Sequence, residues 1–363
     1  MEINRRRLVV AAACTALMAP SFARAQAVDA DGWPVNPLRG PVDLGLTDRV
    51  LNGAIDIHVH LDPDGPGAFS AERSLDVFEA ADIAIARGMR GMVIKAHQDM
   101  GGANAAYMIR QHKDPTFQAF GRMPANLSTG GINAAALEHF TQIRGGWGRI
   151  FEMPTVDGRY QKDPVTREPQ DVSTWDRERL ARIRPWVKLL APDALAYVPI
   201  TKNGELLPEV KRVIGLMPDM RTVDSGGRVV LATGHALPEE HVLIAREGRR
   251  VGLTVLITHP GDIPQLPELA KLGAYIEMTA ALVARTAASK AAAAAVVKKI
   301  GAEHIIMGTD CGTRTNPYPT DCLVMAARGL RANGITEREL DLMYKVNPAK
   351  LLGLEPPDNI ATK

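Results

Sequence analysis

Residues 55–60 read Ile-Asp-Ile-His-Val-His, a short apolar run that ends in two histidines separated by one residue. Such a run is typical of a β-strand that is buried on both faces. In a strand, side chains two positions apart lie on the same face, so we expect both imidazoles to point into one space at the end of the strand. The histidine pair alone is weakly specific, because histidine is common at exposed and half-buried positions.

Seven further apolar runs follow, separated by helix-like stretches. The eight predicted strands are 54–61, 91–98, 117–126, 149–155, 228–235, 253–259, 274–278 and 304–310. Alternation of strands and helices indicates a parallel sheet, and eight such units predict an α/β fold of the (β/α)8 TIM-like barrel type, which takes about 250 residues. A doubly wound open sheet is the second interpretation, but the glycine-rich phosphate loop that usually follows its first strand is missing here.

The connection between the fourth and fifth predicted strands, residues 156–227, is unusually long. Loops in α/β units take about 2–6 residues beyond their helix. Residues 186–208 predict a β-hairpin that turns at Lys202-Asn203-Gly204, because Asn-Gly is a strong turn signal. We interpret the segment as a cap or lid inserted over the barrel mouth, with a peripheral decoration as the alternative.

Polar side chains recur where the predicted strands end. His235 ends the fifth strand, His259 the sixth and Asp310 the eighth. The carboxyl ends of barrel strands form the mouth at which such enzymes keep their active sites. Together with His58 and His60 these residues predict a metal site, because buried imidazole and carboxylate groups must be paired or ligate a metal. Zinc suits these ligands best, with manganese, iron or nickel as alternatives.

This pattern resembles the amidohydrolase superfamily. The resemblance rests on residues 55–60, the later strand-end histidines and aspartate, and the C-terminal stretch 346–354, and it is closest to a branch of uncharacterised function. It implies a metal-dependent hydrolase in which a metal-bound hydroxide attacks an amide, ester, lactone or phosphoester. The implied ligands are His58, His60 and Asp310 for one metal, and His235 and His259 for a second.

The sequence departs from the superfamily at the carboxylated lysine that often bridges two metals from the fourth strand. We favour Lys95 on the second strand as a carboxylated substitute, because it shares a face with His97 and a buried lysine is costly unless neutralised or modified. Glu152 on the fourth strand is one alternative. Lys188 is another, if residues 186–190 form the true fourth strand. The remaining interpretation of Lys95 is an ion pair with a neighbouring carboxylate.

Asp310 and His97, near the predicted mouth, have further expected roles. Asp310 would also be catalytic, accepting a proton from the attacking water and passing it to the leaving group, although a helix N-cap is an alternative. His97 is expected to bind substrate, or else to ligate metal or orient a ligand. Cys311 adjoins Asp310, and the sequence does not decide whether it pairs with Cys322.

Residues 1–27 have the pattern of a cleaved signal peptide: three arginines at positions 5–7, an apolar stretch and an Ala-Gln-Ala cleavage site. The arginine pair favours twin-arginine export, with the Sec route as the alternative. We therefore expect residues 28–363 to form one periplasmic hydrolase domain. Cleavage would change the formal net charge from +2 to −1, since four Arg and one Glu are lost.

The remaining features narrow the class of partner. A hydrophobic fraction of 46% supports a sizeable core. After the N-terminus the sequence has no long basic run, which argues against nucleic acid, and no apolar stretch of the roughly 18 residues that a membrane span requires. We expect a small-molecule substrate and no membrane contact after cleavage. Homo-oligomerisation is left open.

The sequence therefore predicts a metal-dependent hydrolase of a C–N or C–O bond. A mononuclear metal-dependent decarboxylase of the same fold is the first alternative, and an unmodified Lys95 would favour it. A non-enzymatic metal- or ligand-binding barrel is the second, and the full ligand set argues against it. The sequence does not name the substrate, the metal or the number of metal ions.

Overall fold

The computed structural model describes residues 35–36, 40–64, 72–162, 169–222 and 226–362. The predicted signal peptide, residues 1–27, lies outside this part of the chain. Among the described residues, no helix is both long enough and apolar enough to cross a membrane.

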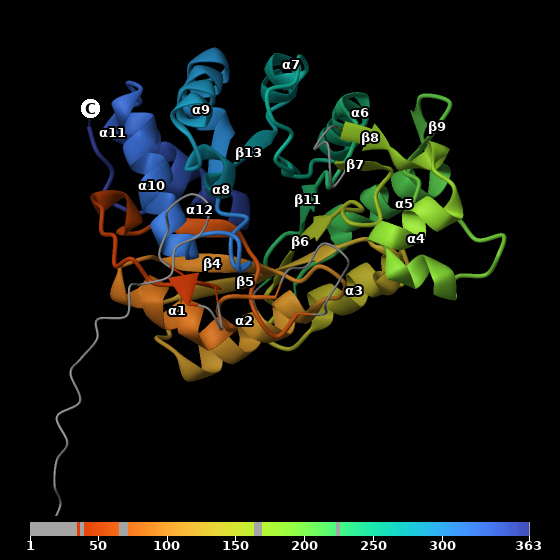
Figure 1. The fold of residues 1–363 in the computed structure, drawn as a ribbon, viewed down its shortest axis with the longest axis horizontal. Coiled ribbons are helices and arrows are strands. Elements are labelled where there is room, and N and C mark those ends of the chain that lie inside the picture. Colours follow the sequence, from red (N-terminus) through yellow and green to blue (C-terminus); the bar gives the residue numbers. More distant parts are fainter. Residues whose placement is uncertain (1–34, 37–39, 65–71, 163–168, 223–225, 363) are drawn as a thin grey trace, which may run out of the picture.

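Eight parallel strands form the central sheet, and neighbours in the chain pair with one another (Figure 1). The strands are β3 (Ile55–Val59), β4 (Gly91–Lys95), β5 (Gln118–Pro124), β6 (Gly148–Glu152), β11 (Val230–Ala232), β12 (Val255–Ile257), β13 (Tyr275–Thr279) and β14 (Ile305–Gly308). The predicted (β/α)8 barrel is confirmed. Seven of its strands are shorter than predicted, mainly because their last residues leave the ladder and form the loops of the mouth, whereas β13 has the predicted length.

The barrel closes where β3 meets the chain just after β14. The backbone N–H of His60 donates to Cys311 O at 2.9 Å, and that of Asp310 donates to His58 O at 2.8 Å. Gly312 has a φ of +112°, and a Cβ at this position would lie 1.6 Å from His60 O. Only glycine permits this approach, so closure depends on it.

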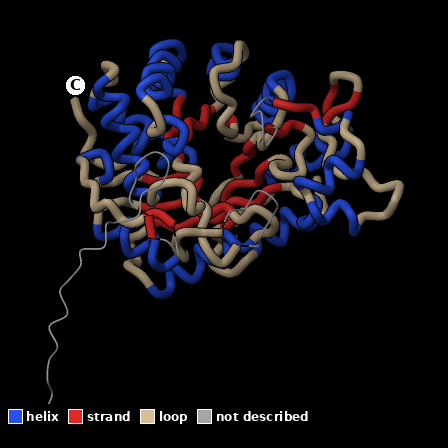
Figure 2. The backbone as a smooth tube through the Cα atoms, viewed as in Figure 1, coloured by secondary structure: helices blue, strands red, loops and turns tan. Residues whose placement is uncertain are grey.

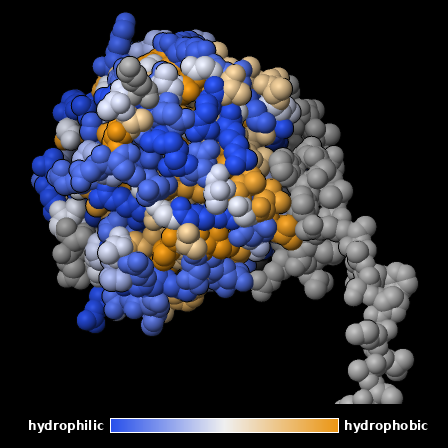
Figure 3. Space-filling view, turned by 90° about the vertical axis from the view of Figure 1, so that its left-hand side faces the viewer, coloured by the Kyte–Doolittle hydropathy of each residue, from blue (hydrophilic) through white to orange (hydrophobic). Residues whose placement is uncertain are grey.

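Helices surround the sheet, as Figure 2 shows. They are α1 (Val77–Ala86), α2 (Gly101–His112), α3 (Ala134–Gln142), α5 (Pro208–Leu216), α6 (Pro238–Arg250), α7 (Leu266–Lys271), α8 (Ala280–Val283), α9 (Ala287–Ile300), α10 (Pro319–Ala332), α11 (Glu337–Asp341) and α12 (Asn347–Leu352). Short 3-10 turns are η1 (Arg49–Leu51), η2 (Leu127–Thr129) and η6 (Ala302–His304), and a π-helical turn, η7 (Leu342–Val346), joins α11 to α12. The side of the molecule formed by the last helices is mostly hydrophilic, with smaller hydrophobic patches (Figure 3).

The barrel interior is closed at its amino-terminal end by α12. Apolar side chains such as Ile57, Phe120 and Ile306 pack inside the strands, and Leu351 and Leu352 of α12 pack against them. This end of the barrel is therefore apolar. Polar side chains are left to gather at the opposite end, at the carboxyl ends of the strands, as expected for the fold.

The long connection between β6 and β11 contains more regular structure than predicted. It holds two short hairpins, β7 (Tyr160–Lys162) with β8 (Pro169–Asp171) and β9 (Thr201–Lys202) with β10 (Glu205–Leu206), together with η3 (Val172–Thr174), α4 (Arg177–Ile183), η4 (Pro185–Leu189), and η5 (Met217–Asp219) after α5. A further two-stranded sheet, β1 (Val35–Asn36) and β2 (Gly40–Pro41), precedes the barrel. The Asn-Gly hairpin is confirmed, with Asn203 at a φ of +52°. The observed hairpin spans residues 201–206 and is therefore much shorter than the predicted one at residues 186–208.

The inserted segment has a small core of its own. Val172, Trp175, Leu180 and Val187 are its main buried members. The segment also contacts the loop after β5, where the Asp157 carboxylate accepts from the backbone N–H of Leu127 at 2.8 Å. This hydrogen bond attaches the segment to one loop of the barrel but does not show that the segment covers the mouth, so its role as a cap stays a prediction.

His241 on α6 gives the fold a pH dependence that can be measured. Its side chain is buried, with Nδ1 2.8 Å from Thr233 Oγ1, and burial lowers the pKa of His241 to about 3. Because the unfolded chain binds this proton near pH 6.5 and the folded chain does not, stability contributed by His241 is present above pH 6.5 and is lost as the pH falls towards 3. Between pH 7 and pH 5, wild type should lose about 2 kcal/mol more free energy of unfolding than His241→Gln.

Urea unfolding at the two pH values measures this difference. His139→Gln, at an exposed position on α3, is the matched control and should follow wild type. Equal losses in wild type and His241→Gln would contradict the prediction.

Candidate metal centre and active site

A β-bulge in β3 turns the two histidines of the opening motif towards the mouth. Ile57 packs in the barrel interior, whereas Val59 packs in the outer layer against the helices. The pairing of β3 with β4 shifts by one residue between Asp56 and Val59. An extra residue in a bulge breaks the alternation of faces, so His58 can lie on the same side as its neighbour Ile57. Strict alternation from Ile57 would have sent both histidines outward.

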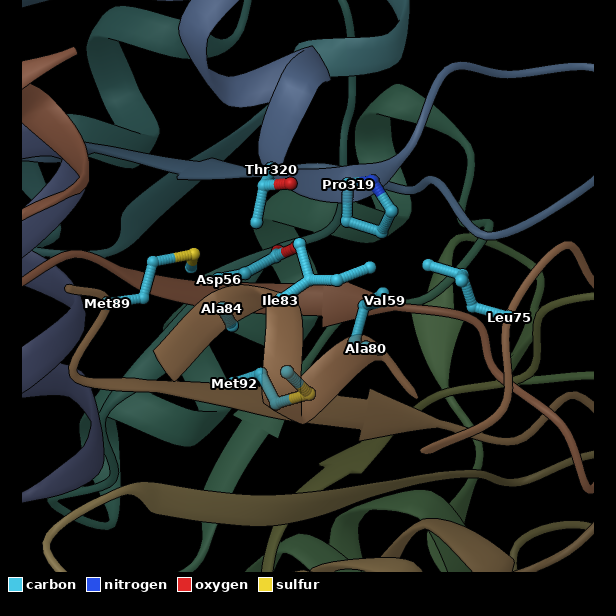
Figure 4. Close-up of a pocket in the computed structure, with 10 residues that line it drawn as sticks. All are labelled: Asp56, Val59, Leu75, Ala80, Ile83, Ala84, Met89, Met92, Pro319 and Thr320. Carbon is cyan, nitrogen blue, oxygen red and sulfur yellow. The ribbon is translucent and has the colours of Figure 1, made fainter. Parts of the chain in front are cut away.

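Asp56 holds this bulge against the end of β14. Its carboxylate accepts from the backbone N–H of His58 at 3.0 Å, from the N–H of Thr309 at 2.9 Å and from the Thr309 hydroxyl at 2.6 Å. Burial raises the pKa of Asp56 to about 7. Figure 4 shows Asp56 beside a narrow cavity of about 10 Å³ between β3, α1 and α10, which is room for about one water. The cavity lies on the helix side of β3 and does not belong to the mouth.

His58, His60 and Asp310 bring three potential ligand atoms together. The two Nε2 atoms lie 3.1 Å apart, and Asp310 Oδ1 is 3.3 Å from that of His58 and 3.1 Å from that of His60. Both imidazoles are buried, while the Asp310 side chain is 33% exposed. The cluster therefore opens to solvent on the side of Asp310.

The remaining ring nitrogens of both histidines contact acceptors. His58 Nδ1 contacts the carboxylate of Glu277, and His60 Nδ1 lies 3.0 Å from the carbonyl oxygen of Lys95. We assign the protons to Nδ1 because these partners accept, which leaves a lone pair on each Nε2. Burial holds the pKa of each imidazole well below its ordinary value, so both are neutral. Two lone pairs and a carboxylate oxygen at 3.1–3.3 Å repel one another unless a cation lies between them. The donor set fits a divalent metal.

His235 and His259 lie beside this cluster without joining it. Their ring centroids are 5.1 Å apart, and that of His259 is 5.8 Å from that of His58. In the described part of the chain, three or more potential ligand atoms come within 4.8 Å of one another in two groups, His58–His60–Asp310 and His60–Asp64–His97. His259 and Asp310 have φ values of +22° and +53°. A positive φ is uncommon for residues other than glycine, and strained positions cluster at active sites.

Four charged side chains fill the barrel interior next to the cluster. Lys95 Nζ lies 3.1 Å from Glu152 Oε2. Arg122 contacts the other oxygen of Glu152 and donates to Glu277 Oε2 at 3.1 and 3.2 Å. Although burial opposes it, Arg122 and Lys95 hold the pKa of Glu152 far below its ordinary value. Of the interpretations of Lys95, the ion pair is the one that this geometry shows.

Lys188 is excluded as the bridging ligand. It lies in η4, a 3-10 turn of the inserted segment, and it is exposed. The fourth strand is β6, which carries Glu152 as first predicted. Residues 186–190 had an apolar character that suggested a strand, but Val187 is the member of this turn that packs into the small core of the insertion.

His97 lies at the end of β4 and stacks on His60, with ring centroids 4.0 Å apart. Its Nδ1 is 2.6 Å from an amino group of Arg73 and 3.3 Å from Asp64 Oδ2, and Arg73 also contacts Asp64. Burial, aided by Arg73, lowers the pKa of His97. A guanidinium already pairs with Asp64 and His97, so the group His60–Asp64–His97 has its cation in Arg73.

A model described as a family of unknown function (DUF6282) matches residues 53–277, more than half of the chain. The chain belongs to the DUF6282 family. No curated protein matches it.

Among solved structures, the DUF6282 chain is similar to a β-aspartyl dipeptidase from Fervidobacterium islandicum in complex with a β-Asp-Leu dipeptide. The identity is 13%, the match covers 84% of this chain and 74% of the other, and the TM-score is 0.54. An amidohydrolase from Burkholderia multivorans with bound zinc matches at 12% identity over 83% of this chain and 99% of the other, with a TM-score of 0.49. At 13% identity, the likeness to the dipeptidase shows a shared fold, which confirms the expected barrel.

Sequence reasoning missed several residues of the DUF6282 site. Glu277, Asp64 and Arg73 were not singled out, and Arg122 and Asp56 had no assigned role at the metal. Glu277 had a visible signal, because it is a lone charge inside the apolar run of the seventh strand. A buried charge needs a partner, so its position could have been read as functional.

Cys311 and Cys322 of the DUF6282 chain are both buried thiols, and their sulfur atoms lie 2.7 Å apart. The sequence left their pairing open. The structure brings them into contact directly behind Asp310, between the end of β14 and α10.

Proposed function

We propose that this DUF6282 protein is a metal-dependent hydrolase that cleaves a C–N or C–O bond, such as an amide, ester or lactone, in a small molecule. The observation that carries the proposal is the convergence of His58 Nε2, His60 Nε2 and Asp310 Oδ1 at the barrel mouth. These three residues would hold a divalent metal, with zinc the best match to the donors. His235 and His259 are the neighbouring donors for further coordination or a second ion. When bound, the metal supplies Lewis-acid chemistry that lowers the pKa of water to about 7 and polarises a carbonyl.

The protein's own residues would position the ligands and move protons. Glu277 and the carbonyl of Lys95 fix the tautomers of His58 and His60. Although burial opposes it, nearby positive charge such as that of Lys95 holds the pKa of Asp310 below its ordinary value, so this carboxylate is charged. Asp310 is also the exposed member of the cluster. It can therefore accept a proton from the attacking water and pass it to the leaving group.

The solved relatives support the reaction class. The β-aspartyl dipeptidase, bound to a dipeptide, shares the barrel at a TM-score of 0.54. Amide hydrolysis is thus a chemistry that this fold accommodates, and the substrate of the present chain is a separate question. We also propose that the protein acts after export to the periplasm. The support for export is the charged, apolar and small-residue pattern of residues 1–27.

A second candidate function is a mononuclear decarboxylase, and the Lys95–Glu152 ion pair favours it. A carbamate would replace the positive charge of Lys95 by a negative charge next to the carboxylates of Glu152 and Glu277. Arg122 would then be the neighbouring cation for all three negative groups. An unmodified Lys95 removes this repulsion and makes one metal per chain the simpler arrangement. We accordingly propose one metal ion with Lys95 unmodified. Carboxylated Lys95 between two ions is the alternative.

Zinc loading followed by a substrate panel tests the proposal. The protein is loaded with Zn²⁺, freed of excess metal and analysed for zinc per chain. It is then incubated with amides, esters, lactones and β-aspartyl dipeptides, and with carboxylic acids for CO₂ release. Metal-dependent hydrolysis with about one zinc per chain is the expected result. CO₂ release without hydrolysis would select the decarboxylase. A protein that retains no metal under any loading condition contradicts both.

A further inference from the structure

Arg73 lies one side chain away from the histidines of the proposed metal centre. Its NH2 group is 2.6 Å from His97 Nδ1, and His97 stacks on His60 with ring centroids 4.0 Å apart. The same NH2 group contacts the buried carboxylate of Asp64. The guanidinium is therefore fixed at the mouth, next to the metal ligands.

The other amino group of Arg73, NH1, has no hydrogen-bond partner among the residues that the structure describes. Arg73 is 7% exposed, and NH1 is buried without a hydrogen bond to any residue that the structure describes. Leaving a buried charged donor unpaired is costly, and native proteins rarely do so without a functional reason. An oxygen atom of a bound ligand would satisfy this group.

His97, which contacts Arg73 through its Nδ1, supplies a second donor. Arginine donates hydrogen bonds and never accepts them, so His97 Nδ1 must accept from Arg73. The proton of the neutral imidazole is then on Nε2. The longer contact from Nδ1 to Asp64, 3.3 Å, would require the opposite tautomer, and the shorter contact with a permanent cation decides between them. Asp64 is held in turn by the backbone N–H of His97, which donates to its Oδ1 at 3.1 Å.

The balance of charge around the centre favours an anionic ligand. Three cations and four carboxylates surround it, namely Lys95, Arg73 and Arg122 against Asp64, Glu152, Glu277 and Asp310. Asp56 is left out of this count because its side chain lies on the helix side of β3, away from the mouth. With the ligand histidines neutral, one divalent metal would then leave a single positive charge in excess among these groups. A monoanionic substrate would neutralise it.

We propose that Arg73 and His97 bind a carboxylate of the substrate, so that the substrates are small molecules carrying a carboxylate near the bond that reacts. This inference rests on the proposed function, because it places the carboxylate beside the same metal centre. Arg73 acts here as a specificity-determining residue. A carboxylate oxygen accepts from NH1, and His97 donates from Nε2.

A pair of probes with nearly the same shape tests the inference. Propionate and propionamide are titrated into the zinc-loaded protein, and their dissociation constants are measured by ligand-observed NMR. Wild type should prefer propionate by about tenfold or more, the usual gain from a charge-assisted hydrogen bond. Arg73→Gln should bring the two constants to near parity while zinc per chain stays unchanged. Arg246→Gln, at an exposed arginine on α6, should keep the wild-type preference.

A second variant covers the case in which Arg73→Gln does not fold, since that change leaves Asp64 without its cation. Asp64→Asn with Arg73→Gln removes both charges together and should also lose the preference. Equal binding of the two probes by wild type overturns the inference, as does a propionate preference that survives in either variant, because the metal alone would then bind the anion. If the protein binds no zinc, the proposed function fails, while the same titrations on zinc-free protein still test Arg73.

Discussion

Replacing His60 by alanine should weaken zinc binding by more than about 100-fold, beyond the 10–100-fold that loss of a hydrogen-bond partner behind a ligand usually produces. His60 is the centre of the cluster, because its Nε2 lies 3.1 Å from both His58 Nε2 and Asp310 Oδ1. The variant removes one of three converging donors. Competition with a chromophoric zinc chelator measures the dissociation constant, and elemental analysis after dialysis gives the zinc that remains.

Two further variants separate ligation from a general effect of mutation. Glu277→Gln keeps all three ligand atoms but weakens the contact that orients His58, so its affinity should fall by about 10–100-fold. His139→Ala removes an exposed histidine on α3 and should bind zinc like wild type. If His60→Ala retained wild-type affinity, the assignment of the metal to this cluster would be wrong.

The strands and the histidines at their ends could be predicted from the sequence, whereas the bulge that orients two of these histidines could not. The strands were visible as apolar runs because parallel strands are buried on both faces. Strand-end histidines were visible for the same reason, since they interrupt those runs. The bulge in β3 was not visible. Its register is set by pairing with β4 and by Asp56, whose partner Thr309 is 253 residues away.

The sequence also could not show which buried charged residues contact one another. The contact of His58 with Glu277 joins residues 219 positions apart, and that of Arg122 with Glu277 spans 155. The sequence could show that each of these polar side chains needs a partner, because each lies within or at the end of an apolar run. Which residue is the partner depends on how the barrel closes. Lys95 illustrates the limit. Its cost of burial was recognised, and Glu152 was recognised as a candidate, yet their pairing with each other needed the structure.

Loss of Arg122 should destabilise the fold strongly. It is buried, and it neutralises two buried carboxylates, Glu152 and Glu277. Arg122→Met keeps an unbranched apolar stem but removes the guanidinium group, and it leaves these carboxylates with Lys95 as the cation in contact with Glu152. Removing one partner of a buried ion pair typically costs about 3–5 kcal/mol, because the remaining charge is buried without compensation. The free energy of unfolding should fall by that amount.

Guanidinium unfolding in the presence of a chelator measures this loss separately from metal binding. Arg246→Met breaks an exposed ion pair with Glu268 and should change stability by less than about 1 kcal/mol. Adding Glu277→Gln to Arg122→Met should recover part of the loss, since one of the two uncompensated charges is removed, and the two changes should therefore be non-additive. A loss no larger than that of Arg246→Met would show that the interior carboxylates do not depend on Arg122. Additive effects in the double variant would show that Arg122 and Glu277 do not act as a pair.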